Sequence, residues 1–347
     1  MKSMVQTYDR ATHNIKIEDL QKAEPLDALQ RELSSGLALY WTTAGHILEG
    51  SGITLLEPAE DFFSIAKNFF SALFLYSYHR VAITQPRRIL YVAVNQCLRG
   101  MVTGCDNLLD DEYKKTLETD LPERGYRFRS ILDIMVSDRV LFQILMESEQ
   151  EHRLTREQVL SASAASLQAL GRSGAQEASE ENGIHEILKP NDVLKKVHHF
   201  KTGMLFECIW AVPLAIEPME KKAVSHLLKA LYKIGMGCQI LDDMVDFHGD
   251  LQQKRHNYIV SLIYHQFNTA GRIRLSEMAN STLAQNDRCT ALNEFPEGRL
   301  AGEQTALGYL ESGLKMLLRE DHQFLATPAI EFMARRIGAD RLMTVFK

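Results

Sequence analysis

The sequence has few cysteines, and their arrangement suits neither a disulfide framework nor a zinc site. The five cysteines are odd in number, scattered along 347 residues and never spaced as CxxC. Such usage is typical of free thiols in a reducing compartment, so we expect a cytoplasmic protein.

The chain also lacks a strong excess of charge and any long apolar run. Its formal net charge is -6, and no basic patch with interleaved aromatic residues is present, which argues against a nucleic-acid partner. The most apolar run, 203–216, contains Glu207 and Pro213 and is too short to span a bilayer. No transmembrane segment is therefore predicted, and the first ten residues lack the apolar core of a signal peptide.

Sustained alternation of apolar and polar residues, which marks a half-buried strand, is missing as well. Almost every long segment has apolar residues at helical spacing instead. Helices are predicted at 26–48, 58–83, 87–116, 126–150, 155–178, 191–216, 219–247, 256–268, 270–285, 297–319 and 328–344. Because no repeat or low-complexity linker divides the chain, we expect a loosely ordered arm at 1–20 and a single all-α domain at 21–347.

Two acidic clusters are present near the ends of predicted helices. Asp106 and Asp110 are four residues apart in the first cluster, as are Asp242 and Asp246 in the second. Positions i and i+4 lie on one helical face, where like charges destabilise a helix by about 0.2–0.5 kcal/mol. Hard oxygen ligands without a Cys or His pattern favour Mg²⁺ over zinc. Two carboxylate faces bridged by Mg²⁺ would suit a diphosphate leaving group.

The acidic clusters belong to longer patterns. Residues 239–250 resemble the second aspartate-rich motif of the trans-isoprenyl diphosphate synthases, QxxDDxxDxxGD, at every fixed position. The Lys-Thr-Gly at 201–203 resembles that family's KTG motif, whose lysine contacts a diphosphate. Residues 106–110 resemble its first motif, DDxxD, with Asn107 in the second place. The resemblance extends over residues 58–265 and implies an all-α isoprenoid-synthase fold with a central cavity.

The same resemblance implies a homodimer, an allylic prenyl diphosphate substrate and three Mg²⁺ ions per site. By position, Asp106 and Asp110 would hold Mg²⁺ on one wall, and Asp242 with Asp246 on the other. Lys201, counted with Asp106, Asp110 and Asp242 as catalytic, would contact the diphosphate. The other predicted substrate-binding residues are Gln239, Thr202, Lys254, Arg255, Lys114, Lys115, Met101, Val102, Leu98, Phe206 and Trp210.

The binding site for a second substrate departs from the family pattern. Elongating members bind isopentenyl diphosphate through a GxKxxRP stretch before the first motif and an Arg pair after it. This chain has no GxKxxRP, and Arg88, the nearest candidate, precedes Asp106 by 18 residues, or roughly 27 Å along a helix. Lys114 and Lys115 replace the Arg pair, and lysine is a point charge rather than a bidentate fork.

Three functions therefore stay open. The Gln–Asp and Lys–Thr–Gly motifs favour a prenyltransferase with an acceptor such as isopentenyl diphosphate. A class I terpene synthase would ionise the same substrate and needs no second diphosphate site. A non-catalytic subunit of a prenyl synthase is the third alternative, because Asn107 replaces an aspartate of the first motif.

Overall fold

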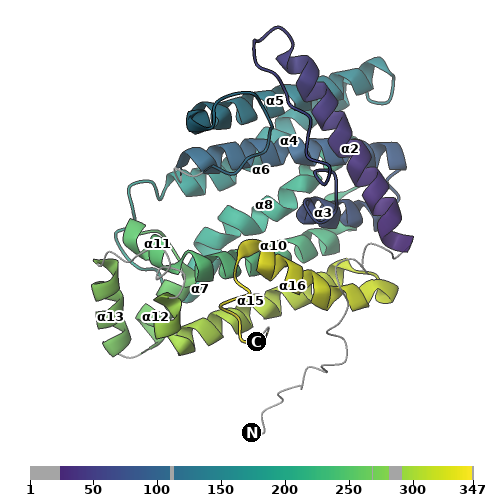
Figure 1. Cartoon of the computed structure of the whole chain (residues 1–347). Helices are drawn as coiled ribbons and strands as arrows, with labels where there is room; N and C mark the ends of the chain where they lie inside the picture. The colour runs from purple at the N-terminus through teal and green to yellow at the C-terminus, as the bar shows by residue number, and fades with distance from the viewer. Residues whose placement is uncertain (1–23, 110–112, 268, 281–290, 346–347) are drawn as a thin grey trace.

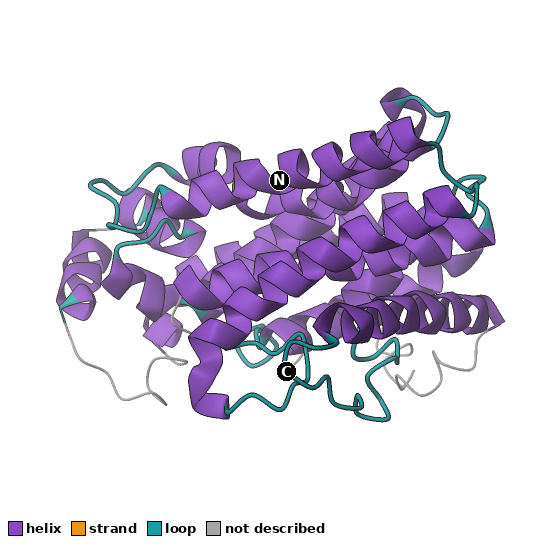
Figure 2. Cartoon of the chain, turned by 90° about the horizontal axis from the view of Figure 1, so that it is seen from above, coloured by secondary structure: helices purple, strands orange, loops and turns teal. Residues whose placement is uncertain are grey.

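The structure is a computed structural model that describes residues 24–109, 113–267, 269–280 and 291–345. The predicted arm at 1–20 lies outside these ranges, as do Asp110 and the two residues after it. The described residues are helical apart from loops (Figure 2), and their one pairing of extended backbone is an antiparallel bridge between Leu55 and Thr119. The prediction of an all-α fold is confirmed.

Six of the described helices are long, namely α2 (Glu24–Leu48), α4 (Gln85–Leu109), α5 (Tyr126–Gln150), α6 (Arg156–Ala178), α10 (Ser225–Val245) and α15 (Pro296–Leu317), and the shorter α3 (Phe69–His79) precedes α4. The other α-helices are α7 (Pro190–Asp192), α8 (Met204–Glu207), α9 (Ala211–Ile216), α11 (Phe247–Gln253), α12 (Tyr258–Gln266), α13 (Thr269–Ala279) and α16 (Ala326–Ile337). The π-helix η3 spans Val193–Gly203, and five 3₁₀ segments are η2 (Glu123–Gly125), η4 (Cys208–Trp210), η5 (Lys221–Val224), η6 (Ala291–Glu294) and η7 (Glu320–Leu325).

Two helices, α4 and α10, each stand at the centre of a packed group. Helix α4 packs against α2, α3 and α5, whereas α10 packs against α15, α16, α8 and η3. Helix α6 joins the groups because it packs against α5 on one side and η3 and α9 on the other (Figure 1). One hydrophobic core extends through both groups, from Leu29 to Met343. The two central helices are the ones whose carboxyl ends carry the acidic motifs.

Helix α4 is held close to α5 by two glycines. A Cβ added at Gly104 would lie 2.7 Å from the carbonyl oxygen of Ser130 and from Cγ1 of Ile134. A Cβ added at Gly100 would lie 2.1 Å from Oγ of Ser137. The two helices could not approach this closely with a larger residue at either position. The position of the first acidic motif is therefore determined by the contact between α4 and α5.

The predicted helix at 58–83 begins only at Phe69. The preceding loop is held by Gln30 on α2, whose Nε2 donates to the carbonyl of Phe63 at 2.8 Å. The Oε1 of Gln30 accepts a hydrogen bond from the backbone N–H of Ile65 at 3.0 Å. Because a side chain distant in sequence satisfies this backbone, the apolar spacing of the loop does not produce a helix.

Arg88, the nearest candidate for a second basic site, has a structural role. Its Nη2 lies 2.5 Å from Oε1 of Glu32, and its Nε donates to Oε2 of the same carboxylate at 2.8 Å. His79 Nε2 lies 2.9 Å from that Oε2, and Glu32 is only 3% exposed. This ion pair joins α2, α3 and α4, so Arg88 is not available to a substrate.

Glu32→Ala is expected to lower the free energy of unfolding by about 3 kcal/mol, because it leaves the Arg88 guanidinium buried without its carboxylate. Urea denaturation would measure this change. The double variant Glu32→Leu/Arg88→Met should recover most of the loss, since apolar replacement of both partners removes the unpaired charge. A loss below 1 kcal/mol in Glu32→Ala would show that the pair contributes little.

Candidate active site

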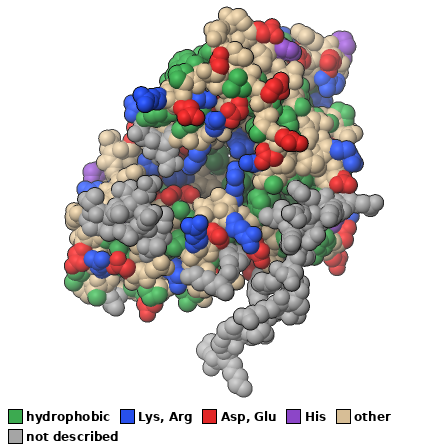
Figure 3. Space-filling view, viewed as in Figure 1, with side chains coloured by type: hydrophobic (Ala, Val, Ile, Leu, Met, Phe, Trp, Pro, Cys, Tyr) green, Lys and Arg blue, Asp and Glu red, His purple; other side chains and the backbone are tan. Residues whose placement is uncertain are grey.

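The acidic motif at the end of α10 is a crowded cluster of carboxyl groups. The pKa of Asp242 is raised to about 7, first by burial and then by the negative charges of Asp243 and Asp250. Burial and the charge of Asp243 likewise raise the pKa of Asp250 to about 7. Carboxylates crowded in this way are stabilised by a proton or a cation. Figure 3 shows a hollow near the middle of the view, with acidic and basic side chains around it.

Asp243 is the structural member of the cluster. It is 2% exposed, and its Oδ2 lies 3.0 Å from Nε2 of His198 on η3. The same oxygen accepts a hydrogen bond from the backbone N–H of Tyr258 at 2.5 Å, at the start of α12. Asn257 Nδ2 donates to the carbonyl oxygen of Asp243 at 2.8 Å. Asp243 thus joins α10 to η3 and α12, and this anchoring positions its neighbour Asp242.

Gln239 connects the Lys-Thr-Gly motif with the acidic motif. The hydroxyl of Thr202 donates to Oε1 of Gln239. The Nε2 of Gln239 donates to Oδ1 of Asp243 at 3.1 Å and more weakly to Oδ2 of Asp242 at 3.5 Å. The side-chain amide therefore has protein partners on both its oxygen and its nitrogen. The predicted direct contact of Gln239 with a diphosphate stays a prediction.

Lys201 is a charged group beside these acids. Burial alone would lower the pKa of its ammonium, but the negative charges of Glu177, Asp250 and others outweigh burial and raise that pKa above its ordinary value. Its Nζ lies 3.2 Å from Oε2 of Glu177, and its carbonyl oxygen accepts a hydrogen bond from Ser173 at 2.9 Å. Lys201 therefore keeps its positive charge next to the acidic motif.

The glycine of the Lys-Thr-Gly motif lets η3 approach α10. A Cβ added at Gly203 would lie 2.5 Å from the ring of Tyr232, and one added at Gly235 would lie 2.9 Å from the carbonyl oxygen of Thr202. One of these glycines lies on η3 and the other on α10, and together they set the distance between the two helices. The wider π-helical turn of η3 ends at this same glycine.

The acidic residues of the first motif lie at the end of α4. Asp106 is half-buried on the last turn, Asp246 is exposed at the end of α10, and Asp110 lies outside the described residues. No group of three or more His, Cys, Asp or Glu among the residues with a described position could hold a metal ion. Mg²⁺ commonly takes one or two carboxylates and completes its octahedron with substrate phosphate oxygens. The carboxylate of Asp242, which is crowded by other acids, suits an ion of that kind, and the assignment of Asp106 and Asp246 as further ligands stays a prediction.

The four basic residues predicted to bind substrate lie in two places, Lys114 and Lys115 after α4, and Lys254 and Arg255 after α11. Lys114 lies near the second motif, since its positive charge lowers the pKa of Asp242, whereas the exposed Lys115 pairs with Glu118 at 2.9 Å. Lys254 is exposed after α11 with a left-handed φ of 54°. The backbone N–H of Arg255 donates to the carbonyl of Asp250 at 2.8 Å.

The side chains of the predicted apolar lining differ in how deeply they are buried. Met101 and Val102 are half-buried on α4, whereas Leu98 is 3% exposed and belongs to the core. The ring of Phe206 is half-buried and contacts Phe70 at a centroid distance of 5.7 Å.

Trp210 lies in the core. Its exposed fraction is 0%, its ring lies 5.0 Å from that of Tyr78, and its Nε1 donates to Oγ of Ser77 at 3.1 Å. A fully enclosed indole of this kind stabilises the packing between α3 and η4. The structure therefore supports a packing role for Trp210 and shows no surface through which it could touch a substrate.

Arg99 is a residue that the sequence analysis missed. It lies on α4 seven residues before Asp106, which places both on nearly the same face of the helix. Its Nη1 donates to Oδ1 of Asn68, just before α3, at 3.1 Å. Burial lowers the pKa of its guanidinium, and the positive charge of Arg336 on α16 lowers it further.

Helix α16 brings Arg336 to this place through an aromatic contact. The ring of Phe332, one turn before Arg336, lies 4.5 Å from that of Phe69 at the start of α3. Neither Arg99 nor Arg336 has an ion pair with any residue in the described ranges. A guanidinium whose charge is disfavoured by burial and by a second arginine, and which has no ion pair with a described residue, is suited to bind an anion. A lone arginine on the apolar face of the helix before DDxxD was the available signal in the sequence.

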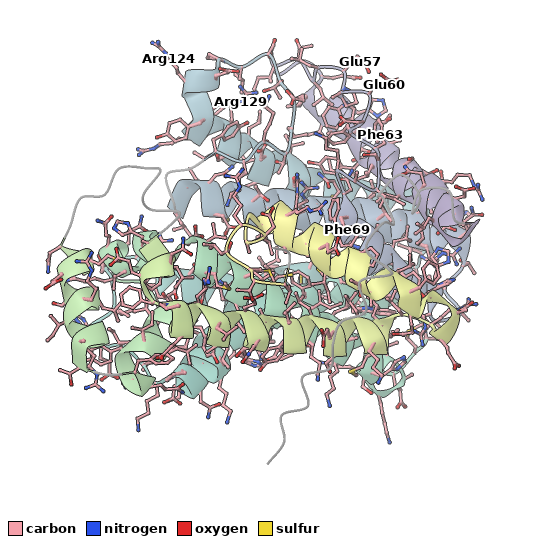
Figure 4. All side chains as sticks on the ribbon, turned by 60° about the horizontal axis from the view of Figure 1, so that its bottom comes forward. Glu57, Glu60, Phe63, Phe69, Arg124 and Arg129 are labelled. Carbon is pink, nitrogen blue, oxygen red and sulfur yellow. The ribbon has the colours of Figure 1, made fainter. Side chains whose placement is uncertain are left out.

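Two of the arginines that follow the first motif lie on different elements, Arg124 on η2 in the loop before α5 and Arg129 on α5 itself. Arg129 is buried and its Nη1 donates to the carbonyl of Leu121 at 2.9 Å. Figure 4 shows Arg124 at the outer end of this loop, pointing away from the body of the molecule, while Glu57 and Glu60 lie on the neighbouring loop. Arg124 therefore does not converge on the acidic motifs.

Comparison with known proteins gives no relative by sequence, since no protein-family profile and no curated protein matches this chain. Solved structures match it over most of its length. A geranylgeranyl pyrophosphate synthase from Lactobacillus brevis has a TM-score of 0.62 at 16% identity, covering 91% of this chain and 99% of its own. The octaprenyl pyrophosphate synthase from Helicobacter pylori has a TM-score of 0.61 at 15% identity, with coverages of 88% and 99%.

A third similar structure was determined with ligands. It is a geranylgeranyl pyrophosphate synthase from Corynebacterium glutamicum, complexed with isoprenyl diphosphate and magnesium. Its TM-score is 0.57 at 14% identity, covering 90% of this chain and 99% of its own. These likenesses show that the chain has the all-α fold of the polyprenyl synthetases. None of the described helices is long and apolar enough to cross a membrane.

Proposed function

We propose that this protein ionises an allylic prenyl diphosphate in the presence of Mg²⁺ and transfers the prenyl group to isopentenyl diphosphate. The observation that carries the proposal is the joining of the Lys-Thr-Gly and QxxDD motifs through Thr202 and Gln239. This contact places a charged lysine beside carboxylates whose pKa values indicate a need for positive charge.

In the proposed reaction the C–O bond of the allylic diphosphate breaks, and the bonding electron pair leaves with the diphosphate. Mg²⁺ held by Asp106 and Asp110 on one side and by Asp242 and Asp246 on the other would supply the charge that stabilises this leaving group. Lys201 adds a fixed positive charge at the same place. The count of three ions stays a prediction.

The second cationic site supports an acceptor that carries its own anionic group. The positive charge of Arg336 lowers the pKa of Arg99, neither residue has an ion pair to a described residue, and Arg99 is on the α4 face that ends in Asp106. A terpene synthase has no use for a second anion site. Arg99 therefore favours transfer to isopentenyl diphosphate over cyclisation.

Diphosphate release from purified protein with Mg²⁺ tests the proposal. Allylic diphosphates of five to twenty carbons would be supplied with and without isopentenyl diphosphate, and products identified by mass spectrometry. Longer prenyl diphosphates formed only with isopentenyl diphosphate are the expected result. Release of a hydrocarbon or alcohol without it would establish the terpene synthase instead, and no release in either condition would favour the non-catalytic subunit.

We also propose that residues 21–347 form one domain that pairs with a second copy through α5 and α6. Six of the fourteen exposed large apolar side chains among the described residues lie on these two helices. They are Phe128, Ile131, Met135, Phe142, Leu160 and Leu167. Such a concentration of apolar surface is typical of an interface. Two adjacent helices, of which α5 has 25 residues, present roughly 700 Å², close to the ~800 Å² that each partner buries in a stable complex.

The pattern on α5 is complementary to itself. Phe128 and Phe142 lie seven residues on either side of Met135, so an antiparallel pairing about a twofold axis at Met135 places each Phe128 opposite the partner's Phe142. The exposed apolar stripe formed by Phe128, Met135 and Phe142 therefore suits a second copy of this chain better than an unrelated partner.

Met135→Glu is expected to give a monomer in light scattering at concentrations where the wild type is dimeric, because two carboxylates would meet at the twofold axis. Mixing Met135→Glu with Met135→Lys should restore a dimer, since opposite charges then meet. Ile273→Glu, an exposed apolar position on α13, is the matched control and should leave the dimer intact. A wild type that stays monomeric would refute the proposed pairing.

A further inference from the structure

Asn107, which takes the second place of the DDxxD pattern, is 1% exposed. Its Nδ2 donates to the carbonyl oxygen of Lys114 at 3.0 Å, and its Oδ1 accepts from the backbone N–H of Lys114 at 2.8 Å. One side-chain amide thus pairs with both polar groups of a single residue across the end of α4. Consecutive helical residues differ in direction by about 100°, so Asn107 does not share the face of Asp106.

The rest of this loop is anchored further along the chain. The backbone N–H of Leu56 donates to the carbonyl of Glu118 at 2.9 Å, and that of Asp120 donates to the carbonyl of Thr54 at 3.1 Å. These bonds hold residues 118–120 against the loop before α3. The side-chain amide of Asn107 holds the loop at its other end, at the backbone of Lys114.

Lys114 in turn acts on the second acidic motif. Its positive charge lowers the pKa of Asp242, although burial, Asp243, Lys201 and Asp250 have larger effects. The lysine therefore connects the end of α4 electrostatically with the end of α10. A cation in this place would face the leaving group of a substrate bound between the two motifs.

We propose that Asn107 is a positioning residue that holds Lys114 where its ammonium binds the diphosphate, an inference that rests on the proposed function. A carboxylate at position 107 could accept from the N–H of Lys114 but would set an oxygen against its carbonyl oxygen. The asparagine is thus the residue that this loop requires. The departure from the DDxxD pattern thus serves the conformation of this loop. The aspartates at the two ends of the motif keep their proposed roles.

Asn107→Asp, which restores the DDxxD pattern, is expected to lower kcat/KM for the allylic diphosphate by about tenfold. Lys114→Gln should have a similar effect, and the double variant should be no worse than either single variant, because both act through one contact. Asn293→Asp, at an exposed asparagine, is the matched control and should be without effect.

Two measurements separate this inference from the proposed function. Calorimetric binding of Mg²⁺ with inorganic diphosphate should weaken about tenfold in Asn107→Asp and Lys114→Gln, whether or not the wild type turns over an allylic substrate. Hydrogen exchange of the Lys114 amide should be faster in Asn107→Asp than in the wild type. The inference is overturned if Asn107→Asp binds diphosphate as tightly as the wild type, or if the losses in the double variant multiply.

Discussion

Asp242→Asn is expected to lower the rate of Mg²⁺-dependent diphosphate release by about 10²–10³-fold while the protein stays folded. Asparagine keeps the shape of the side chain but loses the charge that a cation would require. The hydrogen bond that Gln239 Nε2 donates to Asp242 can be kept by the amide oxygen. The measurement is diphosphate release at saturating allylic substrate over a range of Mg²⁺ concentrations.

The same variant should be more stable than the wild type without metal at high pH. The pKa of Asp242 is raised from 3.8 to about 7 in the folded protein, first by burial and then by Asp243. Its favourable contribution is therefore complete below pH 4 and is lost as the pH rises through about 7. At pH 8 the folded protein must hold an ionised carboxylate that Asp242→Asn lacks. Urea unfolding at pH 5 and pH 8 should show a larger gain at pH 8.

Opposite changes in activity and stability distinguish a site residue from a structural one. Asp321→Asn, at an exposed carboxylate on η7 that pairs with Arg319, is the matched control. We expect it to change neither property appreciably. Activity within twofold of the wild type in Asp242→Asn, or a loss of activity that parallels a loss of stability, would contradict the assignment of this carboxylate.

Arg99→Met is expected to raise the KM for isopentenyl diphosphate by about 10–100-fold and to leave binding of the allylic diphosphate nearly unchanged. A charge-assisted hydrogen bond to a phosphate oxygen accounts for an effect of this size. Methionine fills much of the same volume, so the packing around α4 should be retained. Steady-state kinetics with each substrate varied in turn would measure the two effects separately.

The stability of Arg99→Met provides an independent readout. Burial and the charge of Arg336 both disfavour the charged guanidinium, so its removal should stabilise the protein in the absence of substrate. Arg335→Met, at an exposed neighbour on α16, is the control. A selective rise in the KM of the allylic substrate would instead place Arg99 at the first diphosphate, and the evidence for an acceptor site would be lost.

The helical part of the fold could be predicted from the sequence because amphipathic spacing is a local property. The helix predicted at 126–150 has the bounds of α5, and the helices carrying the acidic motifs end where those motifs begin or soon after. The prediction was wrong at 58–68, where Gln30 satisfies the backbone from another helix. It was also wrong at 113–116, where Asn107 holds the chain in a loop.

The roles of individual side chains depend on contacts that spacing does not encode. Trp210 and Leu98 have apolar side chains near the motifs, yet both lie in the core because the neighbouring helices enclose them. Arg99 looks like an isolated charge in the sequence, and only the tertiary structure shows its hydrogen bond to Asn68 and the effect of the Arg336 charge on its pKa. Burial and proximity across distant segments decide these roles.

Helical periodicity and the chemistry of metal ligands depend on residues that are close together in the chain. The helical class, the order of the motifs and the residue types that suit a Mg²⁺–diphosphate site could therefore be predicted from the sequence alone. The tertiary structure alone decided which acid is structural, since Asp243 meets His198 and Tyr258 from other elements. It also decided that Asn107 serves the loop of Lys114. Hydrogen bonds between groups far apart in the chain form only when the helices are packed, and a pattern of residue types does not specify them.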